Sequence, residues 1–88
     1  QADRDLLDIL MYGLEHFGPS RAETYQQSLA DCFATIAANP GIGRRANTLD
    51  ASARRHEHAS HVVFYERQPD GVLILAVVHA RSIRSAGL

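Results

Sequence analysis

The chain has 88 residues, of which 45% are apolar and 22% are charged, a composition that indicates one small folded domain and excludes a disordered chain. Cys32 is the single cysteine, which excludes an internal disulfide and favours a reducing cytoplasm. No apolar run approaches the roughly 20 residues that cross a bilayer, and no signal peptide is recognisable. We therefore expect a cytoplasmic protein without membrane contact.

The net charge of −1 hides an asymmetry between the two halves of the chain. Residues 1–40 carry two arginines and six acidic residues, a balance of −4. Residues 41–88 carry seven arginines and four acidic residues, a balance of +3, and lysine is absent from both halves. Two interpretations stay open: codon bias in a GC-rich genome, or a guanidinium-rich face that binds carboxylates or phosphates.

Residues 3–17 are predicted to form a helix. Apolar side chains recur there at the i, i+3, i+4 spacing that lines one helical face: Leu6, Ile9, Leu10, Leu14 and Phe17. Acidic residues occupy the first two turns, where the helix dipole favours negative charge. Gly18 and Pro19 then break the helix.

A second helix is predicted at residues 20–39. Ser20 and Glu23 have the spacing of a capping box, which marks a helix start. The apolar stripe that follows consists of Ala22, Tyr25, Leu29, Cys32, Phe33 and Ile36. Asn39 precedes a proline and ends the helix, because a residue before proline avoids the α region. The short break between the two helices predicts an antiparallel hairpin.

The second half of the chain is predicted to form strands. Residues 40–52 are expected to be a loop, followed by a short strand at residues 53–58 and a clearer one at 60–67, where apolar side chains alternate. Residues 68–71, Gln-Pro-Asp-Gly, are typical of a turn. Residues 72–79 are almost continuously apolar, which predicts a strand covered on both faces and central in its sheet.

These elements predict one α+β domain over residues 1–88. No glycine-rich phosphate loop, serine elbow or paired-carboxylate motif occurs along it, so we expect no cofactor. His56 and His58 share a strand face, but no second cysteine or convincing acidic partner completes a metal site, and polar strand surface is the favoured interpretation. Cys32 falls on the apolar stripe of the second helix, which favours a buried hydrophobe over a nucleophile.

Arginines and histidines gather around the predicted strands. If those strands are neighbours, the arginines before the first strand and after the last one can approach the histidines of the sheet. The candidate partner-binding residues are Arg54, Arg55, His58, His61, His79, Arg81 and Arg84. Such a patch suits an acidic peptide, a nucleic-acid backbone or phosphate chemistry, and a solvated rim without a ligand is the alternative.

An ordered set of segments resembles the ParE-type toxins of the RelE/ParE superfamily. The segments match the first helix of these toxins, the stretch after their second helix and their three C-terminal strands. In chain order they are DRDLLDI (3–9), GLEHFG (13–18), NPGIGR (39–44), RRH (54–56), SHVVFY (60–65) and VVHAR (77–81). The resemblance extends over residues 2–82, and its specificity comes from the order of the whole set.

The resemblance implies a RelE/ParE-like fold, a helical hairpin packed on a three- to four-stranded antiparallel sheet, with one strand expected ahead of the first helix. It implies the toxin of a bacterial type II toxin–antitoxin system, neutralised by a ParD-like antitoxin whose C-terminal segment wraps it. ParE-like toxins act on DNA gyrase by stabilising its cleaved-DNA state. We therefore expect a binding protein and no enzyme, without sequence-specific nucleic-acid binding.

Two other functions stay open. The RelE branch cuts mRNA on the ribosome, and such an endoribonuclease needs a base, an acid and cations around the phosphate. Lysine is absent here and no aromatic residue follows Tyr65, but His79 and Arg81 can still serve. The other alternative is an inactive relic that only binds its antitoxin. For that interface we expect apolar anchors across helix and sheet, with Arg54, Arg55 and Arg81 pairing to antitoxin carboxylates.

Overall fold

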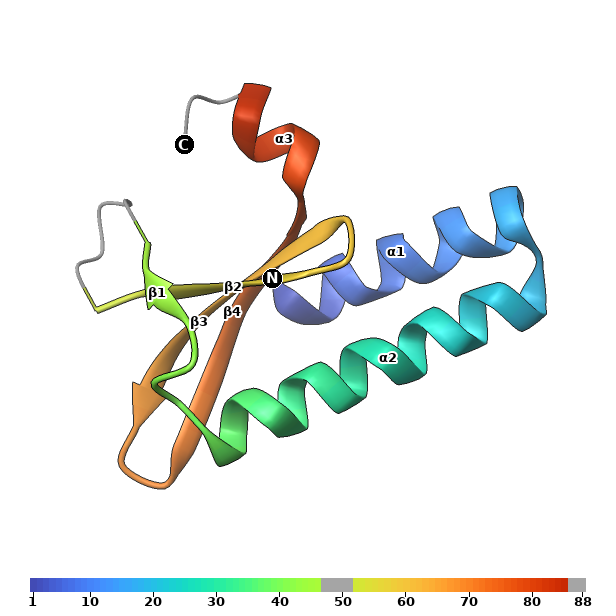
Figure 1. Cartoon of the computed structure of the whole chain (residues 1–88). Coiled ribbons are helices and arrows are strands. Elements are labelled where there is room, and N and C mark those ends of the chain that lie inside the picture. Colours follow the sequence, from blue (N-terminus) through green and yellow to red (C-terminus); the bar gives the residue numbers. More distant parts are fainter. Residues whose placement is uncertain (47–51, 86–88) are drawn as a thin grey trace.

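The computed structural model describes residues 1–46 and 52–85, which form a helical hairpin packed on a four-stranded antiparallel sheet (Figure 1). The elements follow in the order α1 (Ala2–Phe17), α2 (Pro19–Ala38), β1 (Arg44–Arg45), β2 (Arg54–His58), β3 (His61–Gln68), β4 (Gly71–His79) and α3 (Ala80–Ser85). The predicted α+β fold class is confirmed. In the described part of the chain, no helix has the length and apolar character needed to cross a bilayer.

Gly18 joins the two helices of the hairpin. Its φ of +85° lies in the left-handed region, which glycine adopts without strain, so the chain reverses at a single residue. Pro19 then occupies the first helical position, where its fixed φ is already suited to the helix. The predicted capping box is wrong for this reason: the N-cap is Gly18 instead of Ser20, and no side chain caps α2. The carbonyl of Ser20 accepts a hydrogen bond from Thr24 Oγ1 instead.

The strands lie in the order β1-β2-β3-β4, and each neighbouring pair is antiparallel. The prediction that residues 72–79 form a central strand is therefore wrong, because β4 lies at an edge. Its apolar sequence has another cause. One face of β4 packs on the core through Val77, and its free edge is covered by α1, where the Val77 amide donates to Asp5 Oδ2 at 2.9 Å. On the other face Leu73 is 48% exposed.

Strand β1 corrects the prediction of an unbroken loop at residues 40–52. Its two residues pair with Arg54 and Arg55 of β2. Two residues carry too little pattern to be recognised in a sequence, and long-range pairing defines them. The fourth strand of the described sheet is thus β1, whereas the resemblance placed a fourth strand ahead of the first helix. Residues 47–51 of the predicted loop lie outside the described residues.

The hydrophobic core lies between α2 and the sheet. Leu29, Cys32 and Ile36 of α2 pack with Val63, Tyr65 and Val77 of the sheet. The predicted stripe of α2 is thus its core face, and Cys32 is a buried hydrophobe as expected. Burial of each large aliphatic side chain stabilises the fold by about 1.5–3 kcal/mol relative to exposure.

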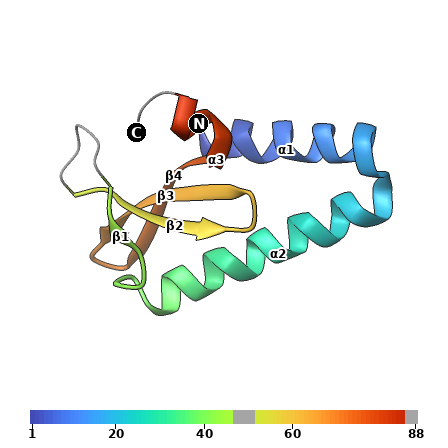
Figure 2. The ribbon, with the colours of Figure 1, turned by 45° about the horizontal axis from the view of Figure 1, so that its top comes forward.

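The predicted apolar stripe of α1 is only partly correct. Leu6 and Ile9 pack against the core, but Leu14 and Phe17 are 39% and 55% exposed. The tip of the hairpin projects beyond the strands of the described structure in both ribbon views, which accounts for the exposure of Leu14 and Phe17 near Gly18 (Figure 2). Amphipathic spacing identifies a helical face, but it does not show how far the neighbouring layer extends.

Tyr65 fixes the segment between α2 and β1. Its side chain is fully buried, its hydroxyl donates to the Pro40 carbonyl at 2.7 Å, and the Gly43 amide donates to that hydroxyl at 2.8 Å. Gly43 is required here, because a Cβ at this position would lie 2.5 Å from the hydroxyl oxygen. Arg54 Nη1 also donates to the Gly43 carbonyl at 2.7 Å. These bonds place β1 beside β2.

Candidate functional site

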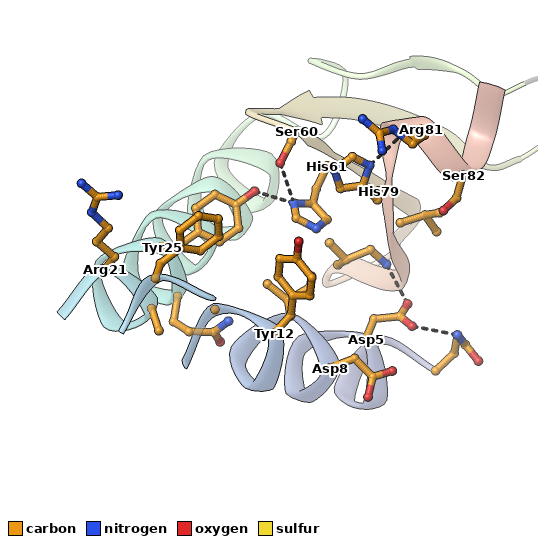
Figure 3. Close-up of a pocket in the computed structure, with 18 residues that line it drawn as sticks. Asp5, Asp8, Tyr12, Arg21, Tyr25, Ser60, His61, His79, Arg81 and Ser82 are labelled. Carbon is orange, nitrogen blue, oxygen red and sulfur yellow. Dashed lines mark hydrogen bonds between the residues drawn. The ribbon is translucent and has the colours of Figure 1, made fainter. Parts of the chain in front are cut away.

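A cleft of about 920 Å³ opens between the helical hairpin and the end of the sheet where β3 begins and β4 ends (Figure 3). Residues of α1, α2, β3, β4 and α3 line it. Its labelled polar residues are Asp5, Asp8, Tyr12, Arg21, Tyr25, Ser60, His61, His79, Arg81 and Ser82. Binding sites favour concave surfaces with converging polar groups, so this cleft is the candidate functional site.

Tyr25 and His61 form the central hydrogen bond of the cleft. The Tyr25 hydroxyl lies 2.6 Å from His61 Nδ1 and so joins α2 to the start of β3. Burial raises the pKa of the Tyr25 hydroxyl, which therefore stays protonated near neutral pH. Burial also lowers the pKa of His61, and His79 and His58 lower it further by charge repulsion. Both shifts favour a neutral imidazole whose Nδ1 accepts a hydrogen bond from the Tyr25 hydroxyl and whose own proton is at Nε2.

His58 and His79 flank His61 on the neighbouring strands. The register pairs His61 with His58 on one side and with His79 on the other, and the rings of His61 and His79 lie edge to face with centroids 5.3 Å apart. Ser28 Oγ donates to the Tyr25 carbonyl and lies 3.0 Å from His58 Nε2, so the serine oxygen accepts the His58 proton. Three of the predicted partner-binding residues are thus brought together.

The predicted arginines are divided among several places. The Arg81 amide donates to His79 Nδ1 at 3.0 Å, which places this exposed residue beside the histidines at the start of α3. Arg84 has its backbone in α3, and its side chain lies outside the described part of the structure. Arg54 is at the end of β2 remote from the histidines and is bound to Gly43. Only Arg81 of these three is seen to join the cleft.

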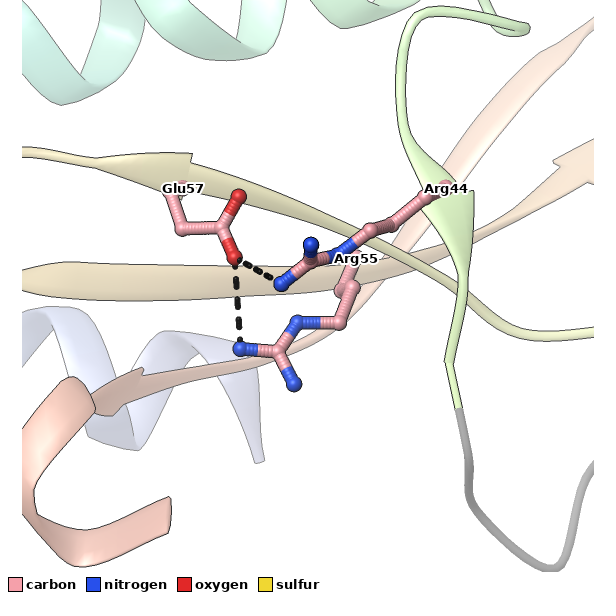
Figure 4. Close-up of polar contacts among 3 residues, drawn as sticks. All are labelled: Arg44, Arg55 and Glu57. Carbon is pink, nitrogen blue, oxygen red and sulfur yellow. Dashed lines mark hydrogen bonds and ion pairs between the residues drawn. The ribbon is translucent and has the colours of Figure 1, made fainter. Parts of the chain in front are cut away.

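Arg55 lies on the face of the sheet opposite the helical hairpin. Its Nη2 is 3.3 Å from Glu57 Oε1, and Arg44 Nη2 reaches the same oxygen at 2.7 Å (Figure 4). The Arg55 guanidinium also lies 5.8 Å from the centre of the Phe64 ring, within the range of a cation–π contact. Residues 54 and 55 are consecutive in a strand, so their side chains point to opposite faces and cannot both reach the cleft.

Several cleft residues were not predicted from the sequence. Asp5 binds the β4 edge, and Tyr12 extends toward the centre of the cleft (Figure 3). Helical spacing placed Tyr25 on the apolar stripe of its helix, and the helix dipole accounted for the acidic residues of the first two turns, which include Asp5. One feature of the sequence could have indicated a polar role for Tyr25. Ser28 lies three residues after it, so two hydroxyl groups share one face of α2.

The cleft can bind in two chemical ways. The neutral His61 can accept a proton, and the exposed Arg81 guanidinium can bind an anion. The aromatic rings of Tyr12 and Tyr25 offer apolar contact area with a polar tip, as protein interfaces favour. Among the described side chains, no three histidine, cysteine or acidic residues converge as a metal site would require. Geometry alone thus allows both a protein-binding and an acid–base role.

Known proteins similar to this chain identify its family. The model of the family described as the ParE toxin of the type II toxin–antitoxin system parDE matches residues 1–84. "Toxin ParE1" of Caulobacter vibrioides is 38% identical over 79 residues, which cover 90% of this chain and 81% of that protein. "Toxin ParE1" of Mycobacterium tuberculosis H37Rv is 31% identical over 68 residues, which cover 76% of this chain and 69% of that protein.

A solved structure supports the fold independently. A chain of the chromosomal ParDE TA system from P. aeruginosa superposes with a TM-score of 0.75 at 20% identity, covering 90% of this chain and 87% of that one. The resemblance seen in the ordered sequence segments is thereby confirmed over nearly the whole chain. The chain belongs to the ParE toxin family of type II toxin–antitoxin systems.

Proposed function

We propose that this chain arrests growth by binding DNA gyrase and stabilising its cleaved-DNA state, while gyrase itself performs the chemistry. The observation that carries the proposal is the match of the ParE toxin family along residues 1–84. Gyrase is the target implied by the resemblance to ParE-like toxins. Because gyrase acts on chromosomal DNA, we propose that the toxin works in the cytoplasm.

A ParD-like antitoxin is the partner proposed for neutralisation. The cleft offers Tyr12, which is 57% exposed, as an apolar anchor for an antitoxin side chain. Arg81 lines the same cleft, is exposed and has no ion pair within the described residues, so its guanidinium is available to an antitoxin carboxylate. The ion pair between Arg55 and Glu57 has to break before Arg55 can bind an antitoxin carboxylate. We therefore expect Arg81 to contribute more to the complex than Arg55.

A ribosome-dependent endoribonuclease is the second candidate, and one observation favours it. The pKa of His61 is lowered, so its imidazole is neutral near neutral pH and can act as a base once the Tyr25 hydroxyl leaves Nδ1, and Arg81 supplies a cation in the same cleft. The same three side chains also serve a binding role without any catalysis. The two candidates therefore differ in their dependence on His61.

One pair of assays separates these functions. The purified chain is added to DNA gyrase with supercoiled DNA, and in parallel to a translating ribosome extract. Linear DNA trapped on gyrase after protein digestion is the expected result, and a ParD-like antitoxin should prevent it. His61→Gln removes the base and is expected to leave gyrase trapping in place.

The other outcomes are equally informative. Cleaved mRNA that disappears with His61→Gln would replace the gyrase proposal by the endoribonuclease. If neither trapped linear DNA nor cleaved mRNA is detected and the chain still binds the antitoxin tightly, the chain is an inactive relic. Circular dichroism of each variant shows that a lost activity does not come from a lost fold.

A further inference from the structure

One side of α1 exposes a continuous row of large apolar side chains. Leu7, Met11 and Leu14 are 57%, 51% and 39% exposed, and their i, i+4, i+7 spacing aligns them along the helix. We call these three residues the α1 ridge. The core contacts of α1 come from Leu6 and Ile9 on another side of the helix, so the ridge has no role in the described core. Single exposed apolar residues are ordinary, but a contiguous row marks an interaction site.

Acidic side chains border the α1 ridge on both sides. Asp8 and Glu15 are three residues before and four residues after Met11, so they lie along one border. On the other side, between α1 and α2, a shallow hollow of about 690 Å³ beside Leu10 is lined by Glu23. None of these three carboxylates forms an ion pair within residues 1–46 and 52–85. Arg4, four residues before Asp8, lies along the first border as well, so the ridge is an apolar strip whose borders carry three carboxylates and one arginine.

We propose that the α1 ridge docks a basic amphipathic helix of a protein partner. The apolar face of that helix packs on Leu7, Met11 and Leu14, and its lysines or arginines pair with the bordering carboxylates. A helical occupant fits because a helix surface offers side-chain ridges and grooves but no free strand edge for an extended peptide.

Charge selects this occupant over the alternatives. A second copy of the chain docked ridge to ridge would bring Asp8 and Glu15 against their own counterparts, and like charges at an interface cost affinity. An acidic segment, as expected for the antitoxin, would be repelled for the same reason. The ridge thus binds a basic partner, whereas the partner proposed for Arg81 is acidic. This second interaction goes beyond the function proposed above.

The test uses two model peptides with the full chain. A Leu/Lys amphipathic helix of 16 residues matches the length of α1, and a Leu/Glu peptide with the same leucine positions is its control. Isothermal titration calorimetry should show the Leu/Lys peptide binding at least about tenfold more tightly. Replacing Leu7 and Met11 together by Gln should weaken that binding by about tenfold or more. Leu73→Gln, at a leucine of β4 that is 48% exposed, should leave the binding of the Leu/Lys peptide unchanged.

A charge swap makes the result decisive. Asp8→Lys combined with Glu15→Lys changes only exposed residues and should transfer the preference from the Leu/Lys to the Leu/Glu peptide. Equal binding of both peptides, or full binding by the Leu7/Met11 variant, would overturn the proposal. A dimer in analytical ultracentrifugation that Met11→Gln abolishes would also overturn it, because the ridge would then belong to a second copy of the chain.

Discussion

Removing the hydroxyl of Tyr65 tests how the segment between α2 and β1 is held. Tyr65→Phe keeps the buried ring but leaves the buried Gly43 amide and the partly buried Pro40 carbonyl without their partner. A net hydrogen bond contributes about 0.5–1.5 kcal/mol, and an unsatisfied buried group costs about 1–3 kcal/mol. The Gly43 amide is buried and stays without a partner, whereas the partly buried Pro40 carbonyl can form a hydrogen bond to water. We therefore expect a loss of about 2–4 kcal/mol in the free energy of unfolding.

Urea unfolding followed by far-ultraviolet circular dichroism measures this loss. The midpoint should fall while the slope m stays unchanged, because the folded and unfolded surfaces are nearly the same. Domains of this size are stable by only about 5–15 kcal/mol, so the effect is large. Tyr12→Phe is the control, since that residue is 57% exposed, and it should change stability by less than about 0.5 kcal/mol. A Tyr65→Phe protein as stable as this control would refute the reasoning.

Four further predictions follow from the packing and charge of single residues. Gly13→Val should destabilise the hairpin by about 1–3 kcal/mol in the same assay, since even a Cβ at residue 13 would lie 3.2 Å from Ala22 Cβ. The pKa of His61 is lower in the folded protein than in the unfolded chain, so the unfolded chain binds more protons as the pH falls. The free energy of unfolding should therefore decrease from about pH 7 to 5. His61→Gln should flatten that part of the plot of unfolding free energy against pH. Cys32 is buried and its pKa is raised, so a thiol reagent should label it slowly in the folded protein and rapidly in urea; fast labelling without urea would contradict the packing. Arg81→Glu should weaken the complex with a ParD-like antitoxin by about 1 kcal/mol or more, and unchanged affinity in a titration would remove that arginine from the interface.

The core of this fold was readable from the sequence because it depends on local periodicity. Leu29, Cys32 and Ile36 recur at helical spacing, and Val63 and Tyr65 alternate as a half-buried strand requires. Each of these patterns survives in the structure because the burying layer actually lies opposite them. Where that layer ends, the same inference failed: Phe17 continues the apolar pattern of α1 as its last residue, but its side chain is 55% exposed.

The failures elsewhere share one physical cause, which is dependence on distant contacts. β4 lies at the sheet edge by strand order, and α1 covers that edge, where Asp5 Oδ2 accepts a hydrogen bond from the Val77 amide. No spacing within residues 72–79 contains that information. Strand β1 likewise depends on Tyr65, a residue 22 positions away from Gly43 in the sequence. Contacts of this kind become visible only when the topology is known.

The candidate site divides in the same way. Strand pairing alone brings His58, His61 and His79 together, because His61 of β3 pairs with a histidine of β2 on one side and with a histidine of β4 on the other. That part of the site was predicted from the order of the strands. Tyr25 could not be predicted as their partner, since the crossing of α2 over the sheet decides which hydroxyl reaches His61.

Asp8 connects the cleft and the α1 ridge, and its position bears on how the two proposed partners relate. The residue lines the cleft that contains Arg81 and also borders Met11 on the ridge. A partner in the cleft and a helix on the ridge therefore approach the same carboxylate from different sides of α1. An acidic antitoxin segment near Asp8 meets repulsion that a basic helix on the ridge would relieve, so the two partners need not compete. If both proposals hold, an antitoxin segment in the cleft and a basic helix on the ridge can bind the chain at the same time.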